Sequence, residues 1–363
     1  MKKNKNYVDL KDQPVPEGQH LLEVDDLKMY FHTEDGVVRA VDGVSYTLDR
    51  GETLGVVGES GSGKSVTAMT IMGLISMPPG KIEGGDVRYR GRSILEMTEE
   101  EMQHIRGNDI AMIFQDPMTS LNPVYKIGKQ VGEGLRLHRG YSKQEALKRA
   151  TELLDLVGIP EPEKRVNEYP HQFSGGMRQR VMIAMALACD PDILIADEPT
   201  TALDVTIQAQ IIELMQEMQE KNGNAIIMIT HDLGVVADMA DKIMVMYAGR
   251  PVEFGTAEEI FYESRHPYTW GLIRSIPEQA IEEKKPLTPI HGNPPSLMNL
   301  PEGCVFSPRC PYATDKCRNQ RPERVVTESG HYSACHYSGD PEFLKNAPET
   351  SRTRKDSKKE GEA

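Results

Sequence analysis

The chain has 363 residues and a formal net charge of −13 at pH 7. This length exceeds that of a typical single domain and predicts one large domain with a smaller appendage. The negative charge argues against a nucleic-acid partner, because binding to a phosphate backbone depends on Lys and Arg. No apolar run is long enough to cross a membrane, and polar residues follow the basic N-terminus. We therefore expect no signal peptide and a cytosolic chain that reaches a membrane only through other proteins.

The N-terminal part of the large domain shows strand patterns. Residues 1–18 contain several prolines and a glycine near their end and predict a flexible tail. Alternating apolar residues at 21–24 and 37–48, and a hairpin-like stretch at 84–89, follow the tail. Short strands joined by tight turns predict an antiparallel β layer.

Four apolar runs predict buried strands, at residues 53–57, 110–114, 193–196 and 225–229. Predicted helices at 66–74 and 205–219 alternate with them, which is typical of a mostly parallel sheet covered on both faces. Helical apolar spacing predicts a helical subdomain at about 120–180. The fold class is therefore α/β.

The C-terminal part differs in composition. We expect the large domain to occupy residues 19–255, because the sequence becomes proline-rich and irregular beyond it. Residues 256–340 are predicted to form a small irregular extension that carries a cluster of cysteines. The charged segment 341–363 has few apolar residues and is predicted to be disordered.

A phosphate-binding loop directly follows the predicted strand at 53–57. The segment Gly58–Ser65 matches the pattern G-x-x-x-x-G-K-[ST]. Its backbone N–H groups and the positive end of the next helix favour an anion, Lys64 adds a charge, and the Ser65 hydroxyl suits a nucleotide-bound Mg²⁺. The predicted nucleotide-binding residues are Gly58, Ser60, Gly61, Ser62, Gly63, Lys64 and Ser65.

Polar residues follow three further predicted strands. Asp197 and Glu198 close one strand, where ligands of open α/β sheets collect, so Asp197 is predicted to hold Mg²⁺ and Glu198 to activate the attacking water. Gln115 has the chemistry to contact Mg²⁺ or this water, although a glutamine at a strand end can also be an ordinary polar cap. His231 is placed to reach the γ-phosphate, although a lone histidine after a strand is more often structural.

A second anion site is predicted at the start of a helix. Ser174 suits the N-cap position, and Gly175 and Gly176 permit close approach of a ligand to free N–H groups. Two such sites in one chain with one phosphate loop raise the possibility that each contacts a different nucleotide.

Together these motifs resemble those of the ATP-binding-cassette (ABC) ATPases, a branch of the P-loop NTPases. The match spans residues 20–255 and rests on the order of the phosphate loop, Gln115, the Ser-Gly-Gly helix, the carboxylates, Ala202-Leu203-Asp204 and His231. The resemblance implies that two cassettes pair head to tail around ATP and Mg²⁺, each nucleotide lying between one phosphate loop and the other chain's Ser-Gly-Gly helix. ATP then joins the pair and hydrolysis releases it.

The resemblance also assigns roles to residues outside these motifs. It implies that Phe31, or Tyr30 beside it, stacks on adenine, and that Asp204 lies in the loop that couples the two sites. One position departs from the pattern, because Met177 stands where the family signature usually has glutamine. Since methionine cannot make a comparable polar contact, we expect a weaker contact to the nucleotide held by the partner.

A closer resemblance is to the ATP-binding subunits of bacterial oligopeptide and dipeptide permeases, and it rests on residues 173–180, 266–272 and 303–311. The first of the two such subunits, which carries methionine in its signature, is the most similar. This implies a second, different ATPase subunit, two integral membrane subunits, an extracytoplasmic peptide-binding protein and a place at the cytoplasmic face of a bacterial membrane. Import of nickel or another small solute, and a soluble ABC protein acting on nucleic acid or ribosomes, remain alternatives.

Four cysteines of the extension have the spacing C-x₅-C-x₆-C-x₁₇-C, formed by Cys304, Cys310, Cys317 and Cys335. Zinc sites usually contain closer C-x₂₋₄-C pairs. The wider spacing suits a [4Fe–4S] cluster, which the resemblance to peptide importers also implies. A zinc site and plain buried thiols remain alternatives. A cluster here would stabilise the extension, which has little apolar content of its own.

Overall fold

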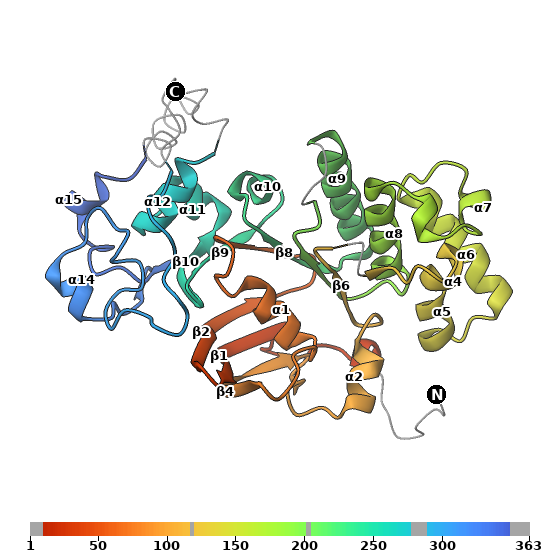
Figure 1. The fold of residues 1–363 in the computed structure, drawn as a ribbon, viewed down its shortest axis with the longest axis horizontal. Coiled ribbons are helices and arrows are strands. Elements are labelled where there is room, and N and C mark those ends of the chain that lie inside the picture. Colours follow the sequence, from red (N-terminus) through yellow and green to blue (C-terminus); the bar gives the residue numbers. More distant parts are fainter. Residues whose placement is uncertain (1–9, 117–119, 201–204, 277–288, 349–363) are drawn as a thin grey trace.

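The computed structural model describes residues 10–116, 120–200, 205–276 and 289–348. A central sheet runs between a helical subdomain on one side and the C-terminal extension on the other, and an antiparallel sheet packs below it (Figure 1). Parallel strands, helices and a separate antiparallel layer confirm the predicted α/β class.

The antiparallel sheet has the strand order β2-β1-β4-β5. Its strands are β1 (Leu22–Thr33), β2 (Gly36–Leu48), β4 (Gly80–Tyr89) and β5 (Arg92–Ser93). Strands β1 and β2 form a hairpin, and β4 pairs with the other edge of β1. This sheet confirms the predicted antiparallel layer.

The central sheet has the order β11-β12-β10-β9-β3-β8-β7-β6. Strands β9, β3, β8, β7 and β6 are parallel, whereas β10, β12 and β11 extend the sheet in antiparallel fashion. The strands are β3 (Thr53–Val57), β6 (Ile110–Ile113), β7 (Ile193–Asp197), β8 (Ala225–Thr230), β9 (Lys242–Tyr247), β10 (Arg250–Thr256), β11 (Val325–Val326) and β12 (Tyr332–Ser333).

The central sheet separates two hydrophobic cores, because successive side chains of a strand point to opposite faces. In β7, Ile193 and Ile195 belong to the core shared with the antiparallel sheet, whereas Leu194 and Ala196 belong to the core shared with the helical subdomain. Both faces are therefore buried, which explains the continuous apolar runs in the sequence.

Helices cover both faces of the central sheet (Figure 1). They are α1 (Lys64–Ile71), α2 (Glu99–Ile105), α9 (Val205–Asn222), α10 (Leu233–Ala237), α11 (Ala257–Tyr262) and α12 (Pro267–Ile273). A capping box between Thr98 and Glu101 begins α2, and a second one between Thr256 and Glu259 begins α11.

The helical subdomain contains α4 (Ile127–Val131), α5 (Glu133–His138), α6 (Lys143–Leu156), α7 (Pro162–Arg165) and α8 (Gly175–Leu187). Helix α6 begins at a capping box formed by Ser142 and Glu145. It buries Ala146, Ala150, Leu153 and Leu154. This spacing places the apolar side chains on one face of the helix.

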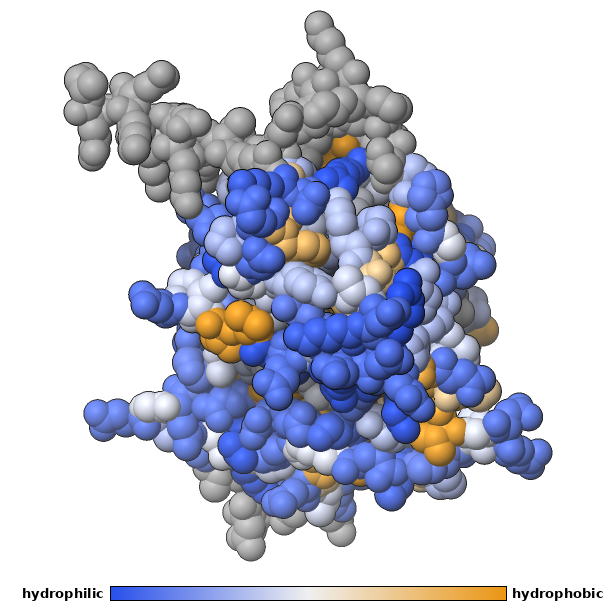
Figure 2. All heavy atoms as spheres, turned by 90° about the vertical axis from the view of Figure 1, so that its left-hand side faces the viewer, coloured by the Kyte–Doolittle hydropathy of each residue, from blue (hydrophilic) through white to orange (hydrophobic). Residues whose placement is uncertain are grey.

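The C-terminal extension joins the sheet through strand pairing. Strand β12 pairs with β10, and Ala334 N–H donates to the Val252 carbonyl at 2.8 Å. Two short helices, α14 (Asp315–Asn319) and α15 (Pro341–Leu344), complete the described part. The outer face of this side of the molecule is mainly hydrophilic, with separated apolar spots (Figure 2).

Parts of the predicted flexible N-terminal tail and of the predicted disordered C-terminal segment are packed. A short 3₁₀ helix at Leu10–Asp12 lies within the predicted N-terminal tail, and its Leu10 side chain is buried. Lys11 Nζ donates to the carbonyls of Asn108 and Cys189. At the other end, Phe343 of α15 contacts Trp270 with a ring-centroid distance of 5.3 Å.

None of the helices in the described ranges has both the length and the apolar character needed to cross a bilayer.

Candidate functional site

The phosphate loop connects β3 to α1, and two of its glycines are required by close contacts. A Cβ at Gly58 would lie 2.2 Å from the Met246 carbonyl oxygen, and one at Gly63 would lie 2.3 Å from the Ala40 carbonyl oxygen. Both glycines have positive φ, at 153° and 99°. Gly61 also has a positive φ, but no heavy atom lies within 4 Å of its Cβ direction. The loop is therefore closed by backbone on one side and open at its tip, where Ser60 and Gly61 are exposed.

Lys64 lies at the base of this loop and is buried. Its Nζ donates to the carbonyls of Gly58 at 2.6 Å and Glu59 at 3.0 Å. Burial lowers the pKa of Lys64, and the nearby carboxylates of Glu198, Asp197 and Glu59 oppose this shift. The ammonium group is thus held inside the loop by backbone carbonyls and the field of three carboxylates.

Ser65 and Asp197 form the predicted magnesium pair. Ser65 Oγ, on α1, donates to Asp197 Oδ1, at the end of β7, at 2.9 Å. Burial raises the pKa of Asp197, the Ser65 hydrogen bond lowers it and the charge of Glu198 raises it further. A hydroxyl and a carboxylate brought together beside a phosphate loop supply two oxygen ligands of the kind that Mg²⁺ prefers.

Glu198 brings the three predicted catalytic residues together. Gln115 Nε2 donates to Glu198 Oε2 at 2.8 Å, and His231 Nδ1 lies 3.4 Å from Glu198 Oε1. The three residues follow β6, β7 and β8, which are adjacent in the sheet, so their side chains meet at its carboxyl edge. The backbone of Glu198 has a φ of 47°, an uncommon value for a non-glycine residue that is often found at functional sites.

The predicted Ser-Gly-Gly anion site begins helix α8. Ser174 Oγ accepts a hydrogen bond from Met177 N–H at 3.3 Å, as expected of an N-cap residue. Ser174 and Gly175 are exposed, and no heavy atom lies within 4 Å of the Cβ direction of Gly175. The Met177 side chain is partly buried against the core. It offers no polar group where the family signature usually has glutamine. The helix itself packs on α4, α6 and β6.

The two remaining nucleotide-binding predictions have different outcomes. Phe31 lies in β1, paired with Val38 on one side and Gly80 on the other, and its ring is partly buried. The neighbouring Tyr30 hydroxyl donates to Asp42 Oδ1 at 3.0 Å. Tyr30 is held by this hydrogen bond, so Phe31 remains the predicted aromatic residue for stacking on adenine. Asp204 lies outside the described residues.

Two residues that contact the phosphate loop were not anticipated from the sequence. Arg309 of the extension pairs with Glu59, and the Tyr268 hydroxyl accepts a hydrogen bond from Glu59 N–H at 2.9 Å. Tyr268 and Arg309 lie within the segments 266–272 and 303–311 that carry the permease resemblance. The resemblance therefore singled out these segments, but it did not predict that Tyr268 and Arg309 contact the phosphate loop.

The four cysteines of the extension line one pocket. Burial raises the pKa of Cys310 to about 11 and that of Cys335 to about 12, so these thiols are protonated at neutral pH in the absence of a metal. Cys304 N–H donates to the Cys317 carbonyl at 2.8 Å, which ties two members together. Within the described residues, no three His, Cys, Asp or Glu side chains are placed to hold a metal ion.

Two family profiles match the chain in succession. The profile described as ABC transporter matches residues 41–201, and the profile described as Oligopeptide/dipeptide transporter, C-terminal region, matches residues 252–317. The first covers the phosphate loop, the start of α8 and the carboxylates. The second covers the beginning of the extension and three of its four clustered cysteines.

Individual relatives extend over most of the chain. The oligopeptide transport ATP-binding protein OppD of Bacillus subtilis (strain 168) is 58% identical over 312 residues, which are 86% of this chain and 87% of the relative. The dipeptide transport ATP-binding protein DppD of Escherichia coli (strain K12) is 52% identical over 317 residues, 87% of this chain and 96% of the relative.

Solved structures agree with these relatives. The dimeric structure of MJ0796, a bacterial ABC transporter cassette, is similar with a TM-score of 0.59 and 29% identity, over 65% of this chain and 98% of that chain. The structure of cbiO1 from Clostridium perfringens, part of the ABC transporter complex cbiONQ, has a TM-score of 0.57 and 29% identity, over 68% and 92%. The geometry of the site and the similarity to these relatives show that the chain belongs to the ABC transporter family and is an ABC-type ATPase.

Proposed function

We propose that this chain is the ATP-hydrolysing subunit of a bacterial peptide importer and works at the cytoplasmic face of the membrane. One observation carries the proposal: a cassette whose Glu198, Gln115 and His231 meet beside the phosphate loop continues directly into an extension of the oligopeptide/dipeptide transporter type. The relatives that span most of the chain are named for oligopeptide and dipeptide transport.

In the proposed mechanism the phosphate loop holds the triphosphate of ATP and Lys64 moves from the loop carbonyls to its oxygens. Ser65, Asp197 and Gln115 would hold Mg²⁺, which would offset negative charge on the phosphates. Glu198 accepts a proton from the attacking water, and His231 contacts the γ-phosphate from the exposed side of Glu198. Phe31 stacks on the adenine ring.

The nucleotide site is completed by a second cassette. The exposed start of α8, with Ser174, Gly175 and Gly176, presents free N–H groups at the positive end of a helix of thirteen residues. We propose that it contacts ATP held by a second, different ATPase subunit, while the partner's equivalent helix contacts ATP held here. Asp204 would couple the two sites. Because Met177 packs on the core, the contact made by this chain depends on backbone and serine groups.

Contact with the membrane subunits is proposed around Gln115. Phe114, Val124 and Tyr125, which lie within ten residues of Gln115 in the sequence, are large apolar side chains that are exposed. Gln115 connects this region to Glu198 through its hydrogen bond. Closure of two cassettes around ATP would therefore move the attached permease subunits, which receive peptide from an extracytoplasmic binding protein.

We propose that the four cysteines of the extension hold a [4Fe–4S] cluster. The four cysteines line one pocket, and four cysteine thiolates, each bound to a different iron atom, are the usual ligands of such a cluster. Anaerobic purification with an absorption spectrum and iron, sulfide and zinc analysis tests this. Stoichiometric iron and sulfide are expected. Zinc in their place would contradict the cluster and support a zinc site.

Reconstitution tests the function itself. The chain is co-expressed with its neighbouring permease, ATPase and binding-protein genes, the complex is purified, and uptake of labelled tri- to hexapeptides into proteoliposomes is measured. ATP-dependent peptide uptake is expected, and a Lys64→Ala variant should abolish it. Uptake of nickel instead of peptides, or failure to co-purify with membrane subunits, would contradict the proposal.

A further inference from the structure

We propose that Arg309 is a positioning residue for the phosphate loop, and that docking of the C-terminal extension thereby sets the affinity of this cassette for ATP. Arg309 neutralises and holds Glu59, which lies within the loop itself, between Gly58 and Ser60. The inference rests on ATP binding at the phosphate loop but not on the identity of the transported solute.

The contact between the two side chains is bidentate. Arg309 Nη1 donates to Glu59 Oε2 at 2.5 Å, and Nη2 donates to Glu59 Oε1 at 3.0 Å. The residues are 250 positions apart in the chain. The Arg309 side chain is 4% exposed and that of Glu59 is 29% exposed, so the pair is shielded from water mainly on the arginine side. The pair is therefore a tertiary contact between the extension and the nucleotide site.

The guanidinium is also fixed from the side of the extension. Arg309 Nε donates to the His291 carbonyl at 2.9 Å, and Nη2 donates to the Ile290 carbonyl at 3.1 Å. Its Nη1 lies 3.3 Å from the Tyr247 hydroxyl, to which it donates. These hydrogen bonds fix the position of the Arg309 guanidinium, and the ion pair with Arg309 in turn fixes the Glu59 carboxylate.

The backbone of Glu59 is held as well. Its N–H donates to the Tyr268 hydroxyl, and its carbonyl accepts from Lys64 Nζ at 3.0 Å. The Tyr268 ring packs against Tyr247 at 4.6 Å and against Phe306 at 5.4 Å between centroids. Phe306 and Arg309 belong to the same turn of the extension, since Arg309 N–H donates to the Phe306 carbonyl. One structural unit thus fixes both the side chain and the backbone of this loop residue.

The charge of Glu59 explains why the pairing matters for ATP. Its carboxylate acts on Lys64, the residue that must attract phosphate oxygens. An unpaired carboxylate at this place would repel the triphosphate and compete for Lys64. The pair of Glu59 and Arg309 has no net charge, so pairing offsets this repulsion, and it also anchors the loop.

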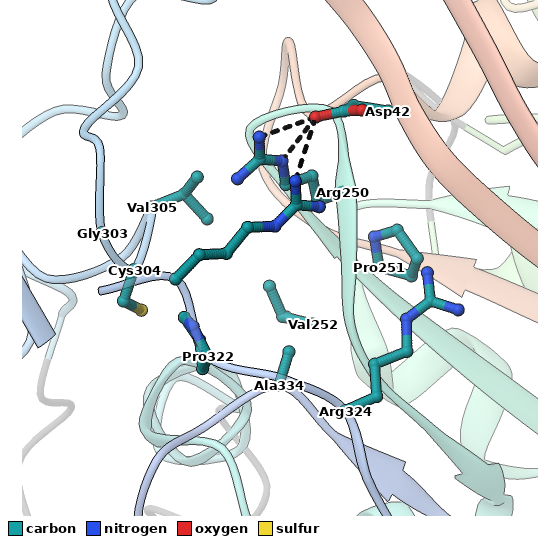
Figure 3. A pocket seen from close by; sticks show the side chains of 11 residues that line it. Asp42, Arg250, Pro251, Val252, Gly303, Cys304, Val305, Pro322, Arg324 and Ala334 are labelled. Atoms are coloured by element: carbon teal, nitrogen blue, oxygen red, sulfur yellow. Dashed lines mark hydrogen bonds and ion pairs between the residues drawn. The ribbon is translucent and has the colours of Figure 1, made fainter. Parts of the chain in front are cut away.

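A second contact of the extension reaches β2, the strand that pairs with the one carrying Phe31. Arg321 Nη1 lies 3.9 Å from Asp42 Oδ2, which also accepts from Arg250 Nε at 2.8 Å. Figure 3 shows Asp42 and Arg250 facing each other at the edge of a pocket between β10 and the extension. Asp42 in turn accepts from Tyr30, next to Phe31. The extension therefore supports both the phosphate loop and the predicted adenine strand.

The test is calorimetric titration of the full chain with Mg-ATP and Mg-ADP. All proteins carry Glu198→Gln so that ATP is not hydrolysed. Arg309→Gln is expected to weaken ATP binding about tenfold and ADP binding less, because ADP brings less charge to the loop. Adding Glu59→Gln should restore affinity to within about twofold, since the unpaired charge is removed. Arg318→Gln is the matched control, because Arg318 is an exposed arginine of the extension paired with Asp315.

Each outcome has a defined meaning. Unchanged affinity in Arg309→Gln, equal losses for ATP and ADP, or no recovery in the double variant would overturn the inference. If Arg309→Gln fails to fold, the Glu59→Gln variant alone tests the proposal. Its amide oxygen can still accept a hydrogen bond from Arg309, so this variant should bind ATP at least as tightly as the parent. Weaker ATP binding would contradict the proposal. No ATP binding by the parent itself would contradict the nucleotide function instead.

Discussion

At the scale of single residues, the catalytic carboxylate is defined by its neighbours. Asp197 and Glu198 are adjacent in sequence, but one is bonded to Ser65 and the other to Gln115. The Ser65 hydroxyl directs Asp197 toward the phosphate loop, whereas Glu198 faces the exposed His231. Two neighbouring carboxylates therefore have environments suited to different tasks, metal binding and proton transfer.

Replacement of Glu198 by glutamine separates these tasks. Glu198→Gln keeps the size and a hydrogen-bonding group but removes the proton acceptor, so the rate of ATP hydrolysis should fall at least about a hundredfold. ATP binding should persist. Phosphate release and nucleotide titration measure the two effects, and Glu217→Gln, at an exposed position of α9, is the control. Near-normal hydrolysis by Glu198→Gln would remove this residue from the role of general base.

At the scale of elements, the junction between β10 and the extension is polar and buried. His331 Nε2 lies 3.0 Å from Glu253 Oε1, and their side chains are 1% and 0% exposed. Glu253 also accepts hydrogen bonds from the backbone N–H groups of Arg265 and His266. A fully buried carboxylate with this many donors fixes the register of the short pairing between β10 and β12.

His331→Ala should destabilise this junction. The change leaves Glu253 with fewer partners in a buried position, and we expect a loss of about 3 kcal/mol in the free energy of unfolding of the part that includes the extension. Chemical denaturation measures it. His291→Ala, an exposed histidine of the same extension, should change stability little. Equal effects of the two substitutions would contradict the structural role of the buried pair.

The link between β2 and the extension is expected to depend on pH. Burial opposes ionisation of Asp42, but Arg250 outweighs burial and holds the pKa of Asp42 below its usual range. The stability that the Asp42 carboxylate contributes to the folded chain is therefore present above its unfolded pKa of about 4. It is lost as the pH falls through the lower pKa that Asp42 has in the folded chain.

Asp42→Asn tests this sign. The variant should be less stable than the parent at pH 7, and the difference should shrink as the pH falls below about 4. Thermal unfolding of both proteins between pH 7 and pH 3 measures the difference. A constant difference over this range would mean that the charge of Asp42 does not contribute.

At the scale of the whole molecule, the predicted nucleotide-binding groups of the single chain are exposed on one side. The phosphate loop is open at Gly61, and the helix end at Ser174 is exposed. Both features fit a site that is completed by a second cassette, since exposed N–H groups at a helix end favour an anion. The family includes a cassette solved as a dimer.

Ser174→Arg should block this pairing. A large side chain at the helix end would prevent the close approach of two cassettes, while ATP binding at the chain's own phosphate loop should remain. Light scattering with Glu198→Gln and ATP, together with the proposed second ATPase subunit, measures association. Pairing that is unaffected by Ser174→Arg would contradict contact between the α8 end and the partner's nucleotide. Arg178, which donates to the Pro170 carbonyl behind the helix end, offers an Arg178→Lys control.

Local sequence patterns were enough to predict four strands of the central sheet, the antiparallel layer and the phosphate loop, and to place Gln115, Glu198 and His231 after strands. Continuous apolar runs identified four of the five parallel strands, and the phosphate loop, Gln115, Glu198 and His231 each come shortly after one of them. The sequence predicted disorder for residues 341–363, but the structure describes residues 341–348, where Phe343 packs on Trp270. Phe343 is one isolated aromatic in a charged segment, and its partner lies far away in the chain.

Only the tertiary structure decided which distant residues meet. The pairing of Arg309 with Glu59, and of His331 with Glu253, joins positions that no local pattern relates. The same holds for the four cysteines, whose spacing suggested a shared site but not the pocket they line. The physical reason is that hydrophobic periodicity and loop motifs are properties of neighbouring residues, whereas buried charge pairs depend on how the sheet edge and the extension pack together.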